Sequence, residues 1–281
     1  MKNSLIALFF LLSVCLYAEP KYQMGICSIF QNEAPFIKEW IDYHIKVGVE
    51  HFWLYNNNSE DNYKEVLLPY LEKGLIDLIE WPSYQFENDF QHFSFEVQTS
   101  SYNHALTISV TSTKWLALID IDEFIVPICN STIQEVLENH YSNCSGVCVN
   151  WQCYGTSHVS RCNPGEMLEM LTLKMRWDHP RNRYYKSIVK PKDVLFTNNP
   201  HFCIYHPGNW HVNAIHEKID VENTGIYIDK IRINHYWTRD EHFLYNIKIP
   251  RYQKWGGNQE DILNLSEEMN EEYDDCILRL K

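Results

Sequence analysis

The sequence is short of positive charge and lacks the cysteine spacing of common zinc sites. Its 281 residues contain 24 lysines and arginines against 37 aspartates and glutamates, a net charge of -13. This balance argues against a general affinity for nucleic acid or for an anionic membrane. No two of its nine cysteines form a CxxC pair, so a structural zinc site is not expected. No linker, repeat or low-complexity tract divides the chain, and its 45% apolar content indicates a globular protein.

Long hydrophobic runs are also scarce, and the longest one is too short to cross a membrane comfortably. Lys2 precedes an apolar stretch from Leu5 to Leu12, and Glu19–Pro20 ends this segment. A charged start, a short hydrophobic region and a small residue at the cleavage position are typical of a secretory signal. We predict that residues 1–18 are a signal peptide or signal anchor. The protein is then exported, as a secreted, periplasmic or membrane-anchored protein, or a luminal one in a eukaryotic cell.

The use of cysteine agrees with export. Five cysteines fall within one stretch, namely Cys129, Cys144, Cys148, Cys153 and Cys162. In an oxidising compartment we expect one or two disulfides there. Cys27 and Cys148 lie in apolar runs, so buried free thiols are the alternative for these two.

Short apolar runs alternate with helical patterns along the chain. In the first half, strands are predicted at Met24–Phe30, Val49–Tyr55 and Leu75–Trp81, with helices at about 34–45, 63–71 and 93–112. In the second half, helices are predicted at about 132–140, 166–172, 240–249 and 264–280, and strands at 146–151 and 226–235. Strands that alternate with helices at short spacing indicate right-handed crossovers and a mostly parallel α/β sheet.

The stretch WLALIDIDEF, Trp115–Phe124, organises the chain. Five apolar residues predict a strand buried on both faces, and it ends on Asp120, Asp122 and Glu123. Residues two apart in an extended segment point the same way, so Asp120 and Asp122 are expected to project together from the carboxyl end, where such sheets bind ligands. A hard divalent cation would relieve their repulsion. The alternative is a pair of solvated turn aspartates.

Other polar residues follow neighbouring strands of the same predicted edge. Glu33 follows the first strand, and Asn57 and Asp61 follow the second. Carboxylate and amide groups there can accept hydrogen bonds from a ribose hydroxyl or from a base N–H group. For Asn57 and Asp61, ordinary turn chemistry or a helix cap is the alternative interpretation.

An ordered set of segments resembles glycosyltransferase family 92 and its bacterial (DUF23-like) relatives. The set comprises Ile29–His44, Gly48–Asp61, Gln98, Tyr102–Asn103, Lys114–Trp115, Asp120–Phe124, Trp151, Gly155, Lys186–Pro191 and Asn234–Tyr236. Two departures stand out. Asn56 stands where the family often has Asp, which affects the preference for the nucleotide base of the donor. Thr238–Arg239 replaces the Lys–Ser that usually follows the segment Asn234–Tyr236, at the carboxyl-terminal end of the site.

The resemblance implies a GT-A (Rossmann-like) fold, with residues 22–281 as one glycosyltransferase domain. It also implies a nucleoside-diphosphate sugar as donor, Mn²⁺ or Mg²⁺ as metal cofactor, and inverting transfer of a sugar to a glycan or other hydroxyl acceptor. UDP-galactose is the first donor to try.

The same resemblance suggests roles for single residues. Asp122 is expected to bind the metal directly, Asp120 to contact the ribose or to reach the metal through water, and His235 to be a third metal ligand. Glu123 either accepts a hydrogen bond just outside the set of metal ligands or is merely a solvated neighbour of them. The basic residues between 174 and 192 are either a solvated face or a phosphate site, and Lys186, which matches the family motif, is the predicted contact for the donor diphosphate.

An inverting reaction needs a general base near the acceptor hydroxyl. Glu217 is the prediction, with Asp178 as a second candidate by position. Trp151 and Tyr154 could stack on a sugar ring, with core packing as the alternative for Trp151. Four histidines, His201, His206, His211 and His216, are spaced by five residues, which fits neither a helix face nor a strand face, so most are expected to be structural.

Two rival functions remain open at this stage. A disulfide-bearing secreted protein could bind glycans through its aromatic residues without catalysis, and it would need no metal. An aspartyl-phosphate phosphatase also has DxD after a buried strand. However, Phe124 stands where that class has Thr or Val, and the acidic pair Asp274–Asp275 falls in a predicted helix.

Overall fold

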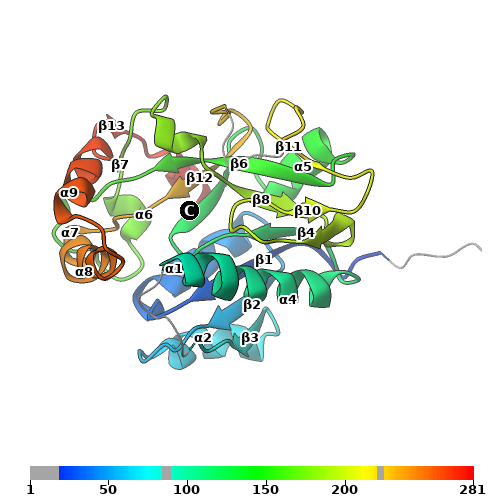
Figure 1. The fold of residues 1–281 in the computed structure, drawn as a ribbon, viewed down its shortest axis with the longest axis horizontal. Helices are drawn as coiled ribbons and strands as arrows, with labels where there is room; N and C mark the ends of the chain where they lie inside the picture. Colours follow the sequence, from blue (N-terminus) through cyan, green and yellow to red (C-terminus); the bar gives the residue numbers. More distant parts are fainter. Residues whose placement is uncertain (1–18, 84–89, 220–224) are drawn as a thin grey trace, which may run out of the picture.

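The structure is a computed structural model that describes residues 19–83, 90–219 and 225–281. One large sheet has the order β3-β2-β1-β4-β8-β6-β12-β5, with β11 beside the start of β6 (Figure 1). Its strands are β1 (Tyr22–Phe30), β2 (His51–Asn56), β3 (Ile76–Glu80), β4 (Thr113–Leu118), β5 (Glu123–Pro127), β6 (Gly146–Cys153), β8 (Tyr185–Val189), β11 (His211–Val212) and β12 (Ile231–His235). Of these described strands, β5 and β8 run against the others. The predicted α/β fold with a mixed, mostly parallel sheet is confirmed.

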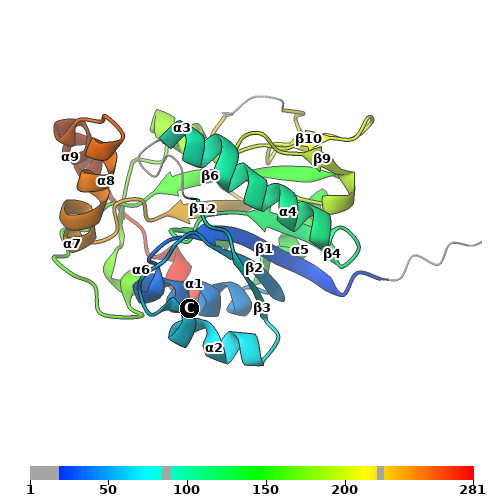
Figure 2. The same ribbon diagram turned by 60° about the horizontal axis from the view of Figure 1, so that its bottom comes forward.

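Helices cover both faces of the sheet (Figure 2). On one face, α1 (Ala34–Lys46), α2 (Tyr63–Glu72) and α5 (Ile133–Tyr141) enclose the larger hydrophobic core. The other face is covered by α3 (Phe90–His92), a π-helical segment (Phe93–Gln98) and α4 (Thr99–Ser109), which bury a second cluster. Because β1, β2 and β4 are covered on both sides, their sequences are almost continuously apolar.

The first helix shows how the sequence directs this packing. Ile37, Trp40 and Ile41 recur at spacings of three and four, and all three are fully buried against the sheet. Pro35 lies in the first turn, where its missing N–H group is not needed. The backbone N–H of Ala34 donates to Asp61 Oδ2 at 2.8 Å, so the loop after β2 holds the start of the helix.

The carboxyl-terminal segment lies at the end of the sheet toward which β1 and β12 point (Figures 1 and 2). It contains α7 (Glu241–Phe243), a π-helical segment (Leu244–Lys248), α8 (Ile249–Lys254) and α9 (Gln259–Glu268). The remaining elements are α6 (Met167–Met170), the pairs β9 (Val194–Phe196) with β10 (Ile204–Tyr205) and β7 (Leu173–Lys174) with β13 (Glu272–Tyr273), and 3-10 turns at Pro180–Arg183, Pro191–Asp193 and Cys276–Leu280. These helices therefore face the carboxyl end of the sheet, which carries the acidic residues and which we call the sheet edge.

Several predictions for the second half are wrong in detail. The helix predicted at 264–280 ends at Glu268, and the chain then pairs with β7 through β13. No local pattern predicts β8, whose polar and basic residues are buried between β4 and β6. The strand predicted at 226–235 begins at Ile231.

The predicted disulfides are not present in the described part of the chain, where all eight cysteines are free thiols. Cys148 and Cys153 lie on one strand, about 17 Å apart at 3.3 Å per residue, and cannot pair with each other. Cys129 Sγ lies 3.6 Å from His140 Nε2, and Cys144 Sγ lies 3.9 Å from a ring nitrogen of His216.

The predicted signal segment, residues 1–18, lies outside the described residues. Within residues 19–83, 90–219 and 225–281, no helix is both long enough and apolar enough to cross a membrane.

Candidate functional site

The acidic tip after β4 is a turn rather than an extended end. Asp120 and Asp122 lie in a tight connection to β5, and Glu123 N–H donates to Asp120 C=O at 3.1 Å. Glu123 folds back so that its Oε2 accepts from Asp120 N–H at 2.9 Å. The turn gives the two aspartates different partners, so the expectation that they project together as one pair is corrected.

Asp120 belongs to a buried network, which we call the Asp120 network: Asp120, Gln98, Tyr102, Lys186 and Glu123. Gln98 Nε2 and Lys186 Nζ donate to the carboxylate of Asp120 at 2.6 and 2.9 Å, and the Tyr102 hydroxyl lies at 3.3 Å. Lys186 Nζ is also 3.7 Å from Glu123 Oε2. Gln98 is the last residue of the first π-helical segment, and Lys186 comes from β8.

Most groups of the Asp120 network have partners within it, although Glu123 Oε1 is buried without a hydrogen-bond partner among the described residues. The Lys186 side chain is only 2% exposed, and although burial lowers its pKa, Asp120 and Glu123 outweigh this effect and raise the pKa. Burial raises the pKa of Glu123 well above its ordinary value, against the opposing effect of Lys186. Lys186 is therefore committed to carboxylates, and the structure does not present it as the predicted diphosphate contact.

Asp122 faces a different set of groups. His235 Nε2 lies 3.6 Å from Asp122 Oδ1 because β12 pairs with β5 in the register that sets His235 beside Glu123. Burial would raise the pKa of Asp122, but His235 and nearby cations lower it below its ordinary value. Burial lowers the pKa of His235, against the influence of Asp122. The pair is thus a carboxylate beside a neutral imidazole.

These are the protonation states that metal ligands require. No group of three or more His, Cys, Asp or Glu side chains in the described residues is arranged to hold a metal. Asp122 and His235 are thus two adjacent side chains of the types that bind divalent cations, without a third such side chain among the described residues. Asp120 is held by Gln98 and Lys186, which agrees better with its predicted indirect role than with direct ligation.

Cations from the carboxyl-terminal half influence Asp122 electrostatically. Lys248 and Arg239 act to lower the pKa of Asp122, and Asp122 in turn acts to raise that of Arg251. Arg181 acts on Lys248. Burial is the largest influence on Lys248 and lowers its pKa to about 7, with Arg251 acting in the same direction and Asp122 against it. Lys248 Nζ and Arg181 Cζ lie 4.2 and 5.0 Å from the centre of the Trp237 ring.

Arg239 is the most constrained of these cations. It has a left-handed backbone (φ 52°), and its guanidinium lies 3.9 Å from the ring centre of Phe36 and 4.4 Å from that of Phe243. Its Nη2 forms an ion pair with Glu33 Oε2 at 2.5 Å, whereas Nε and Nη1 have no hydrogen-bond partner among the described residues. Burial raises the pKa of Glu33, although Arg239 opposes this. Glu33 thus lies at the predicted edge, but it is joined to a cation.

Sequence reasoning missed this cationic cluster. The departure at Thr238–Arg239 marked the right segment, and Lys248 and Arg251 stand three residues apart in an acidic protein. Nothing local in the sequence places them opposite Asp122, because that proximity depends on how α7 and α8 pack against the sheet edge.

Three aromatic rings form a wall beside the Asp122–His235 pair, and we call Trp151, Tyr184 and His201 the aromatic wall. The Trp151 ring lies 4.4 Å from the His235 ring, 5.4 Å from that of His201 and 5.6 Å from that of Tyr184. Trp151 Nε1 is buried without a hydrogen-bond partner among the described residues. Tyr184 is 37% exposed, so the wall reaches the surface.

The predicted general base does not lie at this site. Glu217 is exposed, and its carboxylate accepts from Asn213 Nδ2 at 2.9 Å. It follows β11, which pairs with Gly146 at the start of β6, whereas His235 pairs with Cys153 at the end of that strand. Those two ends are about 23 Å apart at 3.3 Å per residue. The prediction for Glu217 is therefore corrected, because the side chain cannot reach an acceptor held near Asp122.

Other candidates have structural partners. Asp178 forms an exposed ion pair with Arg176 at 2.9 Å. Tyr154 is fully buried, its ring 4.7 Å from that of Tyr236, so it cannot stack on a sugar. His201, by contrast, was grouped with the structural histidines and lies in the aromatic wall.

Asn57 and Asp61 have backbone partners. Asn57 Nδ2 donates to Trp81 C=O at 2.9 Å, and the two Asp61 oxygens accept from the N–H groups of Ala34 and Tyr63 at 2.8 and 3.3 Å. These contacts are those expected of turn and helix-cap residues. A nucleotide contact for either residue remains a prediction.

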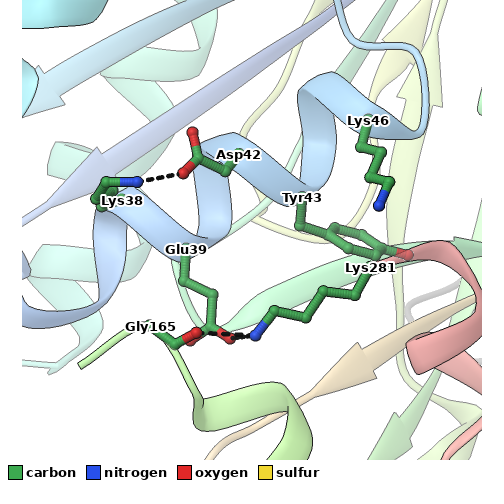
Figure 3. Close-up of a pocket in the computed structure, with 7 residues that line it drawn as sticks. All are labelled: Lys38, Glu39, Asp42, Tyr43, Lys46, Gly165 and Lys281. Atoms are coloured by element: carbon green, nitrogen blue, oxygen red, sulfur yellow. Dashed lines mark hydrogen bonds and ion pairs between the residues drawn. The ribbon is translucent and has the colours of Figure 1, made fainter. Parts of the chain in front are cut away.

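A cavity of about 240 Å³ opens on α1, and none of the site residues above lines it (Figure 3). Its charges are largely paired: Lys38 with Asp42 at 2.5 Å, and Lys281 with Glu39 at 2.6 Å. Its position and its paired charges give it no part in the chemistry of the sheet edge.

Comparisons with known proteins identify the family of the chain. Residues 21–280 match the model of Glycosyltransferase family 92. A glycosyltransferase family 92 protein of Ricinus communis is 27% identical over 227 residues, 79% of this chain and 36% of that protein. The galactan beta-1,4-galactosyltransferase GALS3 of Arabidopsis thaliana is 30% identical over 125 residues, 42% of this chain and 24% of that protein.

A solved structure of S. aureus TarS has a TM-score of 0.42 with 11% identity, over 88% of this chain and 70% of that one. The chain thus spans about a third or less of the length of the curated relatives described here. The predicted resemblance rested on the same segments that build the sheet edge. The family model covers nearly all of the residues after the amino-terminal segment. The chain therefore belongs to glycosyltransferase family 92.

Proposed function

We propose that the protein is a metal-dependent glycosyltransferase that transfers a sugar from a nucleoside-diphosphate donor to a hydroxyl group of a glycan, with inversion. The observation that carries this proposal is the Asp122–His235 pair at a sheet edge, faced by a cluster of cations from the carboxyl-terminal segment. A carboxylate and a neutral imidazole suit a divalent cation, and a cluster of lysine and arginine suits a diphosphate.

Departure of a nucleoside diphosphate places negative charge on the leaving group. Lys248, Arg251 and Arg239 are the cations that interact electrostatically with Asp122, and the unpartnered Nε and Nη1 atoms of Arg239 are suited to phosphate oxygens. Asp122 and His235 would hold Mn²⁺ or Mg²⁺, which when bound neutralises part of the same charge. The diphosphate contact predicted for Lys186 therefore passes to these cations.

Asp120 serves a different purpose in this proposal. Lys186 and Gln98 fix its carboxylate, yet 35% of its side chain remains exposed. A fixed and partly exposed carboxylate at the carboxyl end of β4 is suited to accept from a ribose hydroxyl. Glu33 could act beside it only if the donor competes with Arg239 for its carboxylate.

Galactose is the first sugar to test, because two of the relatives are named galactan beta-1,4-galactosyltransferases. The acceptor we propose is accordingly a glycan hydroxyl. Export of the protein stays a prediction from residues 1–18.

A panel of nucleotide sugars tests the proposal, with and without manganese and read by release of nucleoside diphosphate. We expect turnover of UDP-galactose, stimulated by manganese and by β-1,4-linked galacto-oligosaccharides. The control is Asp122→Asn, expected to be folded and inactive. No release from any donor in the panel would contradict the proposal and favour a glycan-binding protein without catalysis.

A further inference from the structure

The proposed transfer needs a base for the acceptor proton, and neither sequence candidate supplies one. Glu217 lies near the far end of β6, and Asp178 is exposed and paired with Arg176. The carboxylates nearest the Asp122–His235 pair are engaged as well, Glu33 with Arg239 and Glu123 with Lys186 and Asp120 N–H. The base must come from another residue on the acceptor side.

His201 is held in one orientation beside β8. Its Nδ1 lies 2.9 Å from the carbonyl oxygen of Tyr185. A carbonyl oxygen only accepts hydrogen bonds, so Nδ1 carries the hydrogen and Nε2 carries the lone pair. The backbone is fixed at the same point, because Ser187 Oγ donates to His201 C=O at 2.7 Å and His201 N–H donates to Asn199 Oδ1 at 2.8 Å.

The Trp151 ring links this imidazole to His235 of the proposed reaction centre. Trp151 contacts both the His201 ring and the His235 ring, at 5.4 and 4.4 Å between centroids. The hydrogen bond to Tyr185 C=O uses Nδ1, so Nε2 is the ring nitrogen left to accept a proton. Burial and the nearby Lys186 ammonium lower the pKa of His201 to about 4. The imidazole is therefore neutral at pH 7 and about as basic as an aspartate.

We propose that the aromatic wall receives the acceptor sugar and that His201 Nε2 is the general base of the transfer. This inference rests on the proposed function. As the acceptor oxygen bonds to the anomeric carbon, its proton passes to His201 Nε2. The bond between the anomeric carbon and the diphosphate oxygen breaks, and the leaving nucleoside diphosphate takes the electron pair. The exposed face of Tyr184 positions the sugar.

The decisive variant is His201→Asn, in which the amide nitrogen can still donate to Tyr185 C=O while the nitrogen base is lost. His206→Asn is the matched control, because His206 is an exposed histidine of the same segment. Each protein is assayed with UDP-galactose and a β-1,4-linked galacto-oligosaccharide, and UDP binding is measured by calorimetry.

We expect His201→Asn to lower kcat about 100-fold or more, with the Kd for UDP unchanged and with the same circular dichroism as the parent. His206→Asn should match the parent. His201→Ala should regain activity when imidazole is added, which a purely structural role would not allow.

Two failures are distinguishable. If the parent turns over donor and His201→Asn keeps kcat within about threefold, the assignment of His201 is wrong while the proposed function stands. If the parent releases no nucleoside diphosphate from any sugar donor, the proposed function fails, and the assignment fails with it.

Discussion

The surroundings of Asp120 and Asp122 differ sharply, although only one residue separates the two in sequence. The Asp120 network is closed, since Gln98, Tyr102, Lys186 and Glu123 meet nearly all of its hydrogen-bonding and charge requirements within the protein. Around Asp122 neither the charges nor the hydrogen bonds are balanced. The cations outnumber the carboxylates, and buried donors of Arg239 and Trp151 have no hydrogen-bond partner among the described residues.

This difference separates two kinds of acidic residue at one sheet edge. A network whose charges cancel internally maintains the geometry of the turn and gains little from a ligand. A cluster with excess positive charge and unpartnered donors is stabilised when an anion enters it. We therefore expect substitutions in the Asp120 network to affect stability first, and substitutions around Asp122 to affect activity first.

The largest effect is expected from Asp122→Asn. The amide keeps the size of the side chain but removes the negative charge that pairs with His235 and suits a metal. Turnover of the sugar donor should fall about 1,000-fold, which corresponds to about 4 kcal/mol. The variant should still fold, with a lower melting temperature, because the neighbouring cations lose a carboxylate that they stabilise. A variant that hydrolyses UDP-galactose as fast as the parent would refute the metal assignment.

Lys186→Met should mainly destabilise the fold. It leaves Asp120 and the fully buried Glu123 without their cation, and loss of one partner from a buried pair costs about 3–5 kcal/mol. Urea denaturation measures this change. Lys192→Met, at an exposed site on the same segment, is the control and should stay within about 0.5 kcal/mol of the parent.

Adding Glu123→Gln to Lys186→Met should restore part of the lost stability, because the unpaired buried carboxylate is then absent. If Lys186→Met instead unfolds like the parent and loses affinity for UDP, Lys186 contacts the diphosphate after all.

Lys248 should make the binding of UDP depend on pH. Its pKa of about 7 in the free protein means that the ammonium is lost as the pH rises through 7, and an anion binds the protonated form. Affinity should therefore fall by up to about tenfold per pH unit above 7. Lys248→Arg stays charged and should flatten the profile relative to the parent, since the titration of UDP itself is common to both. Identical profiles would contradict the prediction.

The smallest effect is expected from Asp61→Ala, which tests whether Asp61 belongs with the residues that maintain structure. Loss of its hydrogen bonds to the N–H groups of Ala34 and Tyr63 should cost about 1 kcal/mol of stability. Asp61→Asn keeps an acceptor oxygen and should cost less. A clear loss of UDP affinity in either folded variant would instead support the nucleotide contact.

The first half of the sheet could be predicted because its signals are local. Apolar runs of strand length and helices with apolar spacings of three and four set out β1 to β4, and Asp120 and Asp122 were found because they end the most apolar of these runs. Pro35 and Gly48 marked the limits of α1 to within two residues.

The second half depends on contacts between distant residues. Lys186 is in a basic stretch that resembles a solvated face, yet β8 enters the centre of the sheet because β4 and β6 accept it as a partner. Glu217 is the predicted base only because it follows the acidic tip in the sequence. The pairing of β11 with the start of β6 places it at the far end of that strand. His201 could not be separated from its neighbouring histidines, because spacing says nothing about which ring meets Trp151.

The two π-helical segments carry a further consequence. One ends at Gln98, which holds Asp120, and the other ends at Lys248, which lies near Asp122. A π turn contains one more residue than an α turn, so deletion of a single residue from either segment would restore regular helix. The wider turn already absorbs the extra residue, so the side chains on either side of the deletion would keep nearly the same relative direction. These two segments should therefore tolerate loss of one residue at an exposed position, such as Phe95 or Tyr245, better than a regular helix would.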